Sequence, residues 1–202
     1  MTRIGKVLGI SGSPRRDGNT ELLLKEFLRG ARASGHETEL FILNKFKISP
    51  CTSCDSCQKN GQCIIDDDMQ LMYNRLLEAD YIVLASPIYF GGVSAQLKSL
   101  IDRCQALWSR KYILKETLIS PDKGNRSGYF ISTAGSIDGK NIFEGAIIVI
   151  KAIFHVLDIK YKGELLFTGM EKKGDIIKHP DALQTSFKTG MSLRKLNKFL
   201  KR

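Results

Sequence analysis

The sequence has 202 residues, 43% of them hydrophobic, and carries a formal net charge of +10 at pH 7. Such a chain can bury a sizeable core, so its composition excludes a disordered or fibrous protein. No stretch approaches the ~18 apolar residues of a membrane span, and the N-terminal residues show no secretory pattern, so we expect a cytoplasmic protein without membrane contact.

Apolar runs of strand length alternate with periodic segments of helix length along the chain. This alternation is typical of an open parallel α/β sheet with helices on both faces. The sequence therefore predicts the α/β class, as one doubly wound domain over residues 1–202 with a five-stranded parallel sheet in a three-layer sandwich. A cysteine-rich loop is inserted at about residues 49–64. We expect strands at residues 6–10, 38–43, 81–85, 128–132 and 161–167, and helices at residues 19–33, 66–77, 95–108, 142–157 and 180–200.

The loop after the first strand, residues 11–20, is polar and contains two glycines and two arginines. Free N–H groups at a helix N-terminus bind anions, and Ser, Thr and Arg side chains add directed donors. No Gly-Lys-Ser/Thr sequence closes the loop, so it is not a nucleoside triphosphate loop. The pattern predicts a monophosphate site. The alternative is an ordinary turn in which Asp17 or Asn19 caps the helix.

Two further loops follow strands and should meet the first one at the same edge of the sheet. Residues 86–93 place aromatic and branched side chains there, which favours a planar apolar ligand stacked on Tyr89 or Phe90. The alternative is a plug of core residues under a neighbouring loop. The small and polar residues 133–138 are expected to line the other side of such a ligand.

These segments carry a resemblance. The strings GISGSPRRDGNTELL, DDDM and ADYIVLASPIYFGGVSAQLKSLIDR resemble the NADPH-dependent FMN reductase branch of the flavodoxin-like superfamily, most clearly over residues 4–104. The resemblance implies a flavodoxin-like fold, FMN, NAD(P)H as a candidate electron donor, and a homodimer or homotetramer. The implied FMN site comprises Ser11, Ser13, Pro14, Arg15, Arg16, Asn19 and Thr20 around the phosphate, Pro87, Ile88, Tyr89, Phe90 and Gly91 along the isoalloxazine ring, and Thr133, Ala134 and Gly135.

Four cysteines, Cys51, Cys54, Cys57 and Cys63, have the spacing C-x2-C-x2-C-x5-C. In a reducing compartment such a dense run indicates a metal site, and the spacing lets one loop direct several thiolates to a common centre. Zinc and free or redox-active thiols are the alternatives. The spacing resembles the motif of the iron–sulfur flavoproteins, which implies that all four thiols bind one [4Fe–4S] cluster. Cys104 lies on an apolar helix face and is expected to be a buried structural thiol.

The expected function is that of an FMN-dependent redox protein that passes electrons between a one-electron donor, such as a ferredoxin, and a small acceptor. From residue 110 onward 18 Lys and Arg stand against 9 Asp and Glu. They form no dense basic run, so we do not expect nucleic-acid binding, although a basic surface suits an acidic donor. The alternatives are a cluster-free NAD(P)H-dependent FMN or quinone reductase and a thiol-based redox sensor. Residues 110–126 and 170–180 receive no role from the sequence.

Overall fold

The computed structural model describes residues 2–120, 123, 125–135, 141–193 and 196–197. Its centre is a parallel sheet in the strand order β3-β2-β4-β6-β7, which is the doubly wound order of flavodoxin-like folds. The predicted five-stranded parallel sheet is therefore confirmed. Its strands are β2 (Lys6–Ser11), β3 (Glu37–Ile42), β4 (Tyr81–Tyr89), β6 (Ser127–Thr133) and β7 (Lys160–Phe167).

Two short strand pairs accompany this sheet. β5 (Gly92–Val93) folds back antiparallel on the end of β4, and β1 (Thr2–Arg3) pairs with β8 (Leu196–Asn197). The loop predicted at residues 86–93 is thus largely a β-hairpin, because β4 continues to Tyr89: it pairs with β6 as far as Pro87, and Ile88 and Tyr89 pair with β5.

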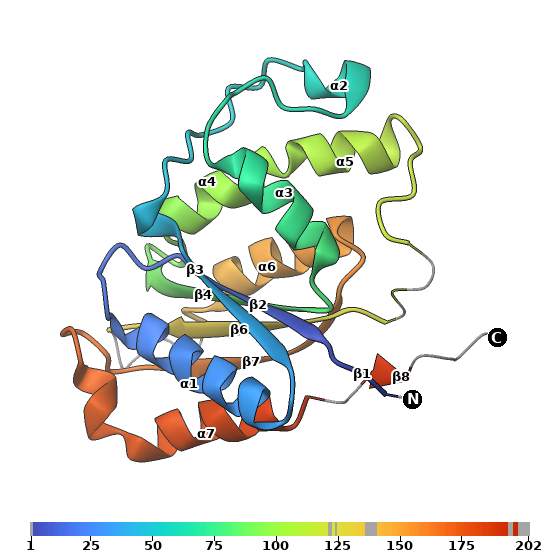
Figure 1. Cartoon of the computed structure of the whole chain (residues 1–202). Helices are drawn as coiled ribbons and strands as arrows, with labels where there is room; N and C mark the ends of the chain where they lie inside the picture. The colour runs from blue at the N-terminus through green and yellow to red at the C-terminus, as the bar shows by residue number, and fades with distance from the viewer. Residues whose placement is uncertain (1, 121–122, 124, 136–140, 194–195, 198–202) are drawn as a thin grey trace.

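Helices cover both faces of the sheet, so the three layers predicted from the sequence are present (Figure 1). On one face α1 packs on α7, over a core that includes Leu23 and Phe27. The other face carries the remaining long helices, over a core that includes Met72 and Ile150. The helices are α1 (Asn19–Ala33), α2 (Cys57–Asn60), α3 (Met69–Glu78), α4 (Ala95–Arg103), α5 (Gln105–Tyr112), α6 (Glu144–Val156) and α7 (Pro180–Met191), with short 3-10 turns η1 (Leu43–Lys45) and η3 (Asp175–Lys178).

Helices α1 and α7 cross at glycines, and their backbones come close there. A Cβ atom at Gly30 would lie 2.0 Å from the carbonyl oxygen of Phe187, and one at Gly190 would lie 1.9 Å from that of Phe27. The hydroxyl of Ser186 also donates to the carbonyl of Leu23 at 2.7 Å. The crossing holds α7 directly against the helix that follows the first loop.

Three helical predictions need correction. The single helix expected at residues 95–108 is two helices, α4 and α5, separated at Cys104, where the carbonyl of Arg103 accepts a hydrogen bond from the Tyr73 hydroxyl. The helix expected at residues 66–77 is α3, which begins later, at Met69, and ends at Glu78. The last helix starts at Pro180 as predicted but ends at Met191, since residues 196–197 pair with β1; residues 194–195 and 198–200 lie outside the described residues.

Within the described part of the chain, no helix is both long and apolar enough to cross a membrane.

Candidate functional site

A cleft, here called the rim cleft, opens where β2, β4 and β6 end at one edge of the sheet. It encloses about 170 Å³. Nine of the side chains or glycines expected around FMN line it: Ser13, Arg15, Asn19, Thr20, Pro87, Ile88, Tyr89, Thr133 and Gly135. The ends of parallel strands therefore bring together segments that are more than 100 residues apart in the sequence.

Six expected residues are not among those that line the rim cleft. Ser11 and Ala134 are buried, and Pro14 is half-buried. Arg16 is exposed, with its Nε 3.9 Å from a carboxylate oxygen of Asp17. Phe90 and Gly91 form the tip of the hairpin at positive φ, and Phe90 is fully exposed there.

The first loop, residues 11–20, is folded by its own side chains. The Ser13 hydroxyl donates to the carbonyl of Arg15 at 2.9 Å and accepts from the Arg15 N–H at 3.1 Å. Gly18 is the N-cap of α1, and no side chain caps this helix. The alternative of Asp17 or Asn19 as a helix cap is therefore wrong. An uncapped helix N-terminus that opens on a cleft is suited to bind an anion.

The Asp17 carboxylate serves another contact. It pairs with the ammonium group of Lys25 at 2.6 Å. The hydrogen bond from Lys25 is the main reason that the pKa of Asp17 lies below its ordinary value. Lys25 also pairs with the carboxylate of Glu21, in the first turn of α1, at 2.7 Å.

Asn19 joins the first loop to a segment that follows β7. Its amide nitrogen donates to the carbonyls of Met170 at 3.3 Å and Lys172 at 3.0 Å, and its amide oxygen accepts from the N–H of Ile176 at 3.3 Å. Arg15 adds a 3.1 Å bond from its guanidinium to the carbonyl of Glu171. Asn19 therefore builds the wall of the rim cleft rather than only facing a ligand.

Besides Gly18 of the first loop, three residues that line the rim cleft were not among the expected site residues: Met170, Glu171 and Lys173. They follow β7, whose end lies at the same edge of the sheet as those of β4 and β6. The rule that located the other loops would have pointed here too, but residues 170–173 contain neither glycine nor a hydroxyl group.

Serines fix the floor beneath the rim cleft. The Ser94 hydroxyl donates to the carbonyl of Gly12 at 2.5 Å and accepts from the N–H of Leu97 at 3.3 Å, which caps α4. The Ser94 N–H donates to the Ser86 hydroxyl at 2.9 Å, and the Ser132 hydroxyl donates to the carbonyl of Ser86 at 2.7 Å. The start of α4 is thus bonded to two of the strand ends. Ser11, beside this network, is buried with a hydroxyl that has no hydrogen-bond partner in the structure.

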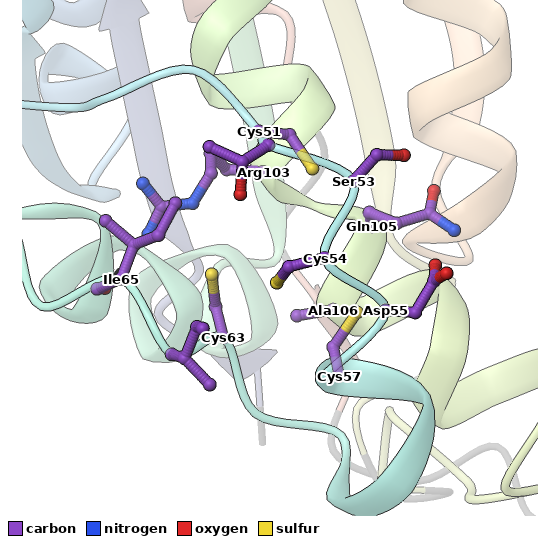
Figure 2. Close-up of a pocket in the computed structure, with 12 residues that line it drawn as sticks. Cys51, Ser53, Cys54, Asp55, Cys57, Cys63, Ile65, Arg103, Gln105 and Ala106 are labelled. Carbon is purple, nitrogen blue, oxygen red and sulfur yellow. Dashed lines mark hydrogen bonds between the residues drawn. The ribbon is translucent and has the colours of Figure 1, made fainter.

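A second cavity of about 70 Å³, the cysteine pocket, lies between the cysteine loop (residues 49–64) and the junction of α4 and α5 (Figure 2). Cys51, Cys54, Cys57 and Cys63 all line it. Cys51 and Cys54 are exposed, whereas Cys57 and Cys63 are half-buried. The loop is not wholly irregular, since Cys57 begins the short helix α2.

The chain bends sharply to bring these thiols to one pocket. Ser53 and Asp55 have φ angles of 55° and 58°, a left-handed conformation that costs energy for residues other than glycine. The Cys57 thiol lies 3.4 Å from the buried Ser109 hydroxyl of α5. The N–H of Ser56 is the main reason that the pKa of Cys54 is lowered. Strain of this kind is typical of a ligand-binding loop.

The spacing of the four thiols bears on which metal suits them. In the described residues, no three His, Cys, Asp or Glu side chains stand close enough to hold one metal ion. A tetrahedral zinc ion at ~2.3 Å from each sulfur would need sulfurs only about 3.8 Å apart. Four thiols that line one cavity are the donor set of a [4Fe–4S] cluster as well as of such a zinc ion.

A buried ion pair lies beneath the cysteine pocket. The Arg103 guanidinium makes two bonds to the Asp67 carboxylate, at 2.7 and 3.1 Å, and both side chains are at most 2% exposed. Burial alone would raise the pKa of Asp67, but Arg103 and the N–H groups of Ser49 and Met69 outweigh it and lower that pKa. Asp67 also accepts a hydrogen bond from the N–H of Met69, at the start of α3, at 3.0 Å.

Cys104 does not line the cysteine pocket. It is 1% exposed, and this burial raises the pKa of its thiol to about 12. The expectation of a structural thiol therefore agrees with its surroundings.

The known proteins that this chain resembles are FMN reductases and iron–sulfur flavoproteins. The family model of NADPH-dependent FMN reductases matches residues 5–161. An iron–sulfur flavoprotein of Methanocaldococcus jannaschii is 50% identical over 102 residues, which are 50% of this chain and 53% of that protein. One of Methanosarcina thermophila is 37% identical over 134 residues, 66% of this chain and 65% of that protein. The chain thus spans about half to two thirds of the length of these curated relatives.

Among solved structures, the NAD(P)H:quinone oxidoreductase from Methanothermobacter marburgensis has the same fold. The TM-score is 0.75 at 20% identity, and the alignment covers 96% of this chain and 98% of that one.

Proposed function

Because the chain belongs to the NADPH-dependent FMN reductase family, we propose that it is an FMN-dependent oxidoreductase whose cysteine pocket holds a [4Fe–4S] cluster. It passes electrons between a one-electron donor of ferredoxin type and a small acceptor. The observation that carries the proposal is the presence of two separate sites in one domain: a rim cleft with an uncapped helix N-terminus, and a pocket lined by four thiols.

In the rim cleft, the N–H groups that begin α1 and the hydroxyls of Ser13 and Thr20 hold the phosphate. Arg15 adds its positive charge from the same loop. The segment from Pro87 to Tyr89 lies along the flavin ring, with Thr133 and Gly135 opposite. FMN supplies a ring that accepts one or two electrons, and these residues position it and limit its contact with water.

In the cysteine pocket, Cys51, Cys54, Cys57 and Cys63 are the ligands. Two observations support this assignment. All four thiols line one cavity, and the relatives with 50% and 37% identity are iron–sulfur flavoproteins. A cluster exchanges one electron at a time, so its presence suits a one-electron donor.

The second candidate is a cluster-free NAD(P)H-dependent FMN or quinone reductase. The family match supports it independently of the cysteines. In that case nicotinamide would approach the flavin over the hairpin of β4 and β5, where Tyr89 is 42% exposed. We also propose a homo-oligomer, because Phe90 at the tip of this hairpin and Ile148 on α6 are exposed apolar side chains.

Anaerobic purification followed by visible spectroscopy and iron and sulfide analysis tests the proposal. We expect flavin bands, a broad shoulder near about 400 nm and about four iron atoms per chain. Cys54→Ala should lose the iron and keep FMN, whereas the matched variant Cys104→Ala, which changes a thiol outside the cysteine pocket, should keep both. Flavin without iron, together with fast NADPH oxidation, would favour the second candidate. Zinc without flavin would refute both.

A further inference from the structure

Arg103 fastens both ends of the cysteine loop. Its guanidinium donates to the carbonyl of Ser49 at 3.0 Å, just before the first cysteine, and to the carbonyl of Ile65 at 3.2 Å, just after the last. The Asp67 carboxylate completes the arrangement by accepting from Arg103 and, at 2.8 Å, from the N–H of Ser49. One buried side chain therefore closes a loop of more than a dozen residues at its base.

One N–H group of Arg103 is not used in these hydrogen bonds. Arg103 is 1% exposed, and its Nε has no hydrogen-bond partner in the structure. Arg103 also lines the cysteine pocket, and Figure 2 shows its side chain on the side of the pocket where Cys63 lies. A buried N–H of a charged group without a partner is costly, which indicates that the pocket supplies an acceptor when it is filled.

We propose that Arg103 is a positioning residue for the cysteine pocket and that its positive charge, opposed by Asp67, sets the reduction potential of the group bound there. The inference rests on the proposed function, since it takes that group to be the cluster. Net charge and hydrogen bonds to the sulfurs govern the potential of such a cluster. Reduction adds negative charge, so Arg103 favours the reduced state and Asp67 favours the oxidised one.

Because Arg103 and Asp67 carry opposite charges, removing each charge should shift the midpoint potential of the cluster in opposite directions. Arg103→Gln removes the positive charge and should lower the midpoint potential of the cluster, whereas Asp67→Asn removes the negative charge and should raise it. A merely structural role predicts otherwise, because either change would loosen the base of the cysteine loop and shift the potential in the same direction. Potentials are read by redox titration of the cluster's visible absorption, without any turnover assay.

Two further variants keep the test decisive. Arg103→Gln leaves Asp67 buried without its partner and is therefore liable to misfold. Arg103→Lys keeps the charge but cannot reach both Ser49 and Ile65. The midpoint potential of its cluster should therefore stay close to that of the unaltered protein. Hydrogen exchange at residues 50–64 should become faster in the FMN-bound, cluster-free form of this variant. Lys98→Gln serves as the matched control, since it breaks an exposed ion pair to Asp102 on the same helix and should change neither reading.

The outcomes distinguish a failure of the proposed cluster from a failure of the proposed role of Arg103. Iron absent from the unaltered protein would refute the proposed cluster. Iron present, with potentials that do not move or move in the same direction in the Arg103 and Asp67 variants, would refute the role of Arg103 alone. Opposite shifts, with faster loop exchange in Arg103→Lys, would establish it.

Discussion

Replacing Asn19 by alanine separates the first loop from the segment that walls the rim cleft. The change deletes three hydrogen bonds at once, to the carbonyls of Met170 and Lys172 and from the N–H of Ile176. Met170 and Ile176 are buried, so their backbone groups cannot turn to water when the amide is lost. Each of the two buried groups left without a partner costs about 1 to 3 kcal/mol, and the exposed Lys172 carbonyl costs little, so we expect a loss of at least about 2 kcal/mol.

Urea unfolding of the cofactor-free protein measures this loss directly. FMN binding should weaken as well, because the cofactor must then order residues 170–176 as it binds. If the whole cost falls on binding, the dissociation constant rises by roughly 30-fold or more, which quenching of flavin fluorescence detects.

Asn44→Ala provides the matched control. Asn44 makes one exposed bond to the same loop, from its amide nitrogen to the carbonyl of Pro14 at 3.0 Å. Its loss should cost less than about 1 kcal/mol. An Asn19→Ala protein as stable as Asn44→Ala, with an unchanged FMN dissociation constant, would show that the 170–176 segment does not depend on Asn19 and would refute the reasoning.

Two other predictions concern stability. Gly30→Ala places a Cβ 2.0 Å from a backbone oxygen, where ordinary contacts begin near 3.4 Å. We expect the free energy of unfolding to fall by about 3 kcal/mol and the melting temperature to fall by roughly 6 to 12 °C. The control Gln184→Ala, at an exposed position of α7, should change little, and a Gly30→Ala protein more stable than the unaltered one would contradict the close crossing. Because the pKa of Asp67 is lowered in the folded state, its pairing stabilises the fold above pH 3.8 and is lost as the pH falls through that lowered pKa. Acid unfolding should therefore be less steep in Asp67→Asn, and identical curves would argue against the pair.

Most of the loops that form the rim cleft could be located from the sequence, because a single rule about parallel sheets applies to them. In a parallel sheet the loops that follow the strands meet at one edge, so locating the strands also located residues 11–20 and 86–93. The segment after β7 escaped because its cleft-lining residues 170–173 contain neither glycine nor a hydroxyl group, and only Thr168 and Gly169 before them resemble a ligand loop. The role of Asn19 escaped as well, since its partners lie more than 150 residues away.

The cysteine pocket shows a different limit. The spacing of four cysteines marks the loop, but nothing local indicates that Arg103 and Asp67, 36 residues apart, close its base. The break at Cys104 was hidden for a similar reason. The apolar stripe of Leu100, Cys104 and Leu107 continues through the break. The interacting group comes from another helix, since the hydroxyl of Tyr73 on α3 donates to the carbonyl of Arg103.

Helix α4 begins at the floor of one site and ends beneath the other. Ser94 anchors its start to the strand ends below the rim cleft, and Arg103, its last residue, holds the base of the cysteine loop. Nine helical residues span about 13.5 Å, and each inserted residue would add about 1.5 Å and turn the helix end by about 100°. Under the proposed function, the length of α4 therefore sets the distance between the floor of the rim cleft and the base of the cysteine loop, and an insertion or deletion in α4 would change it.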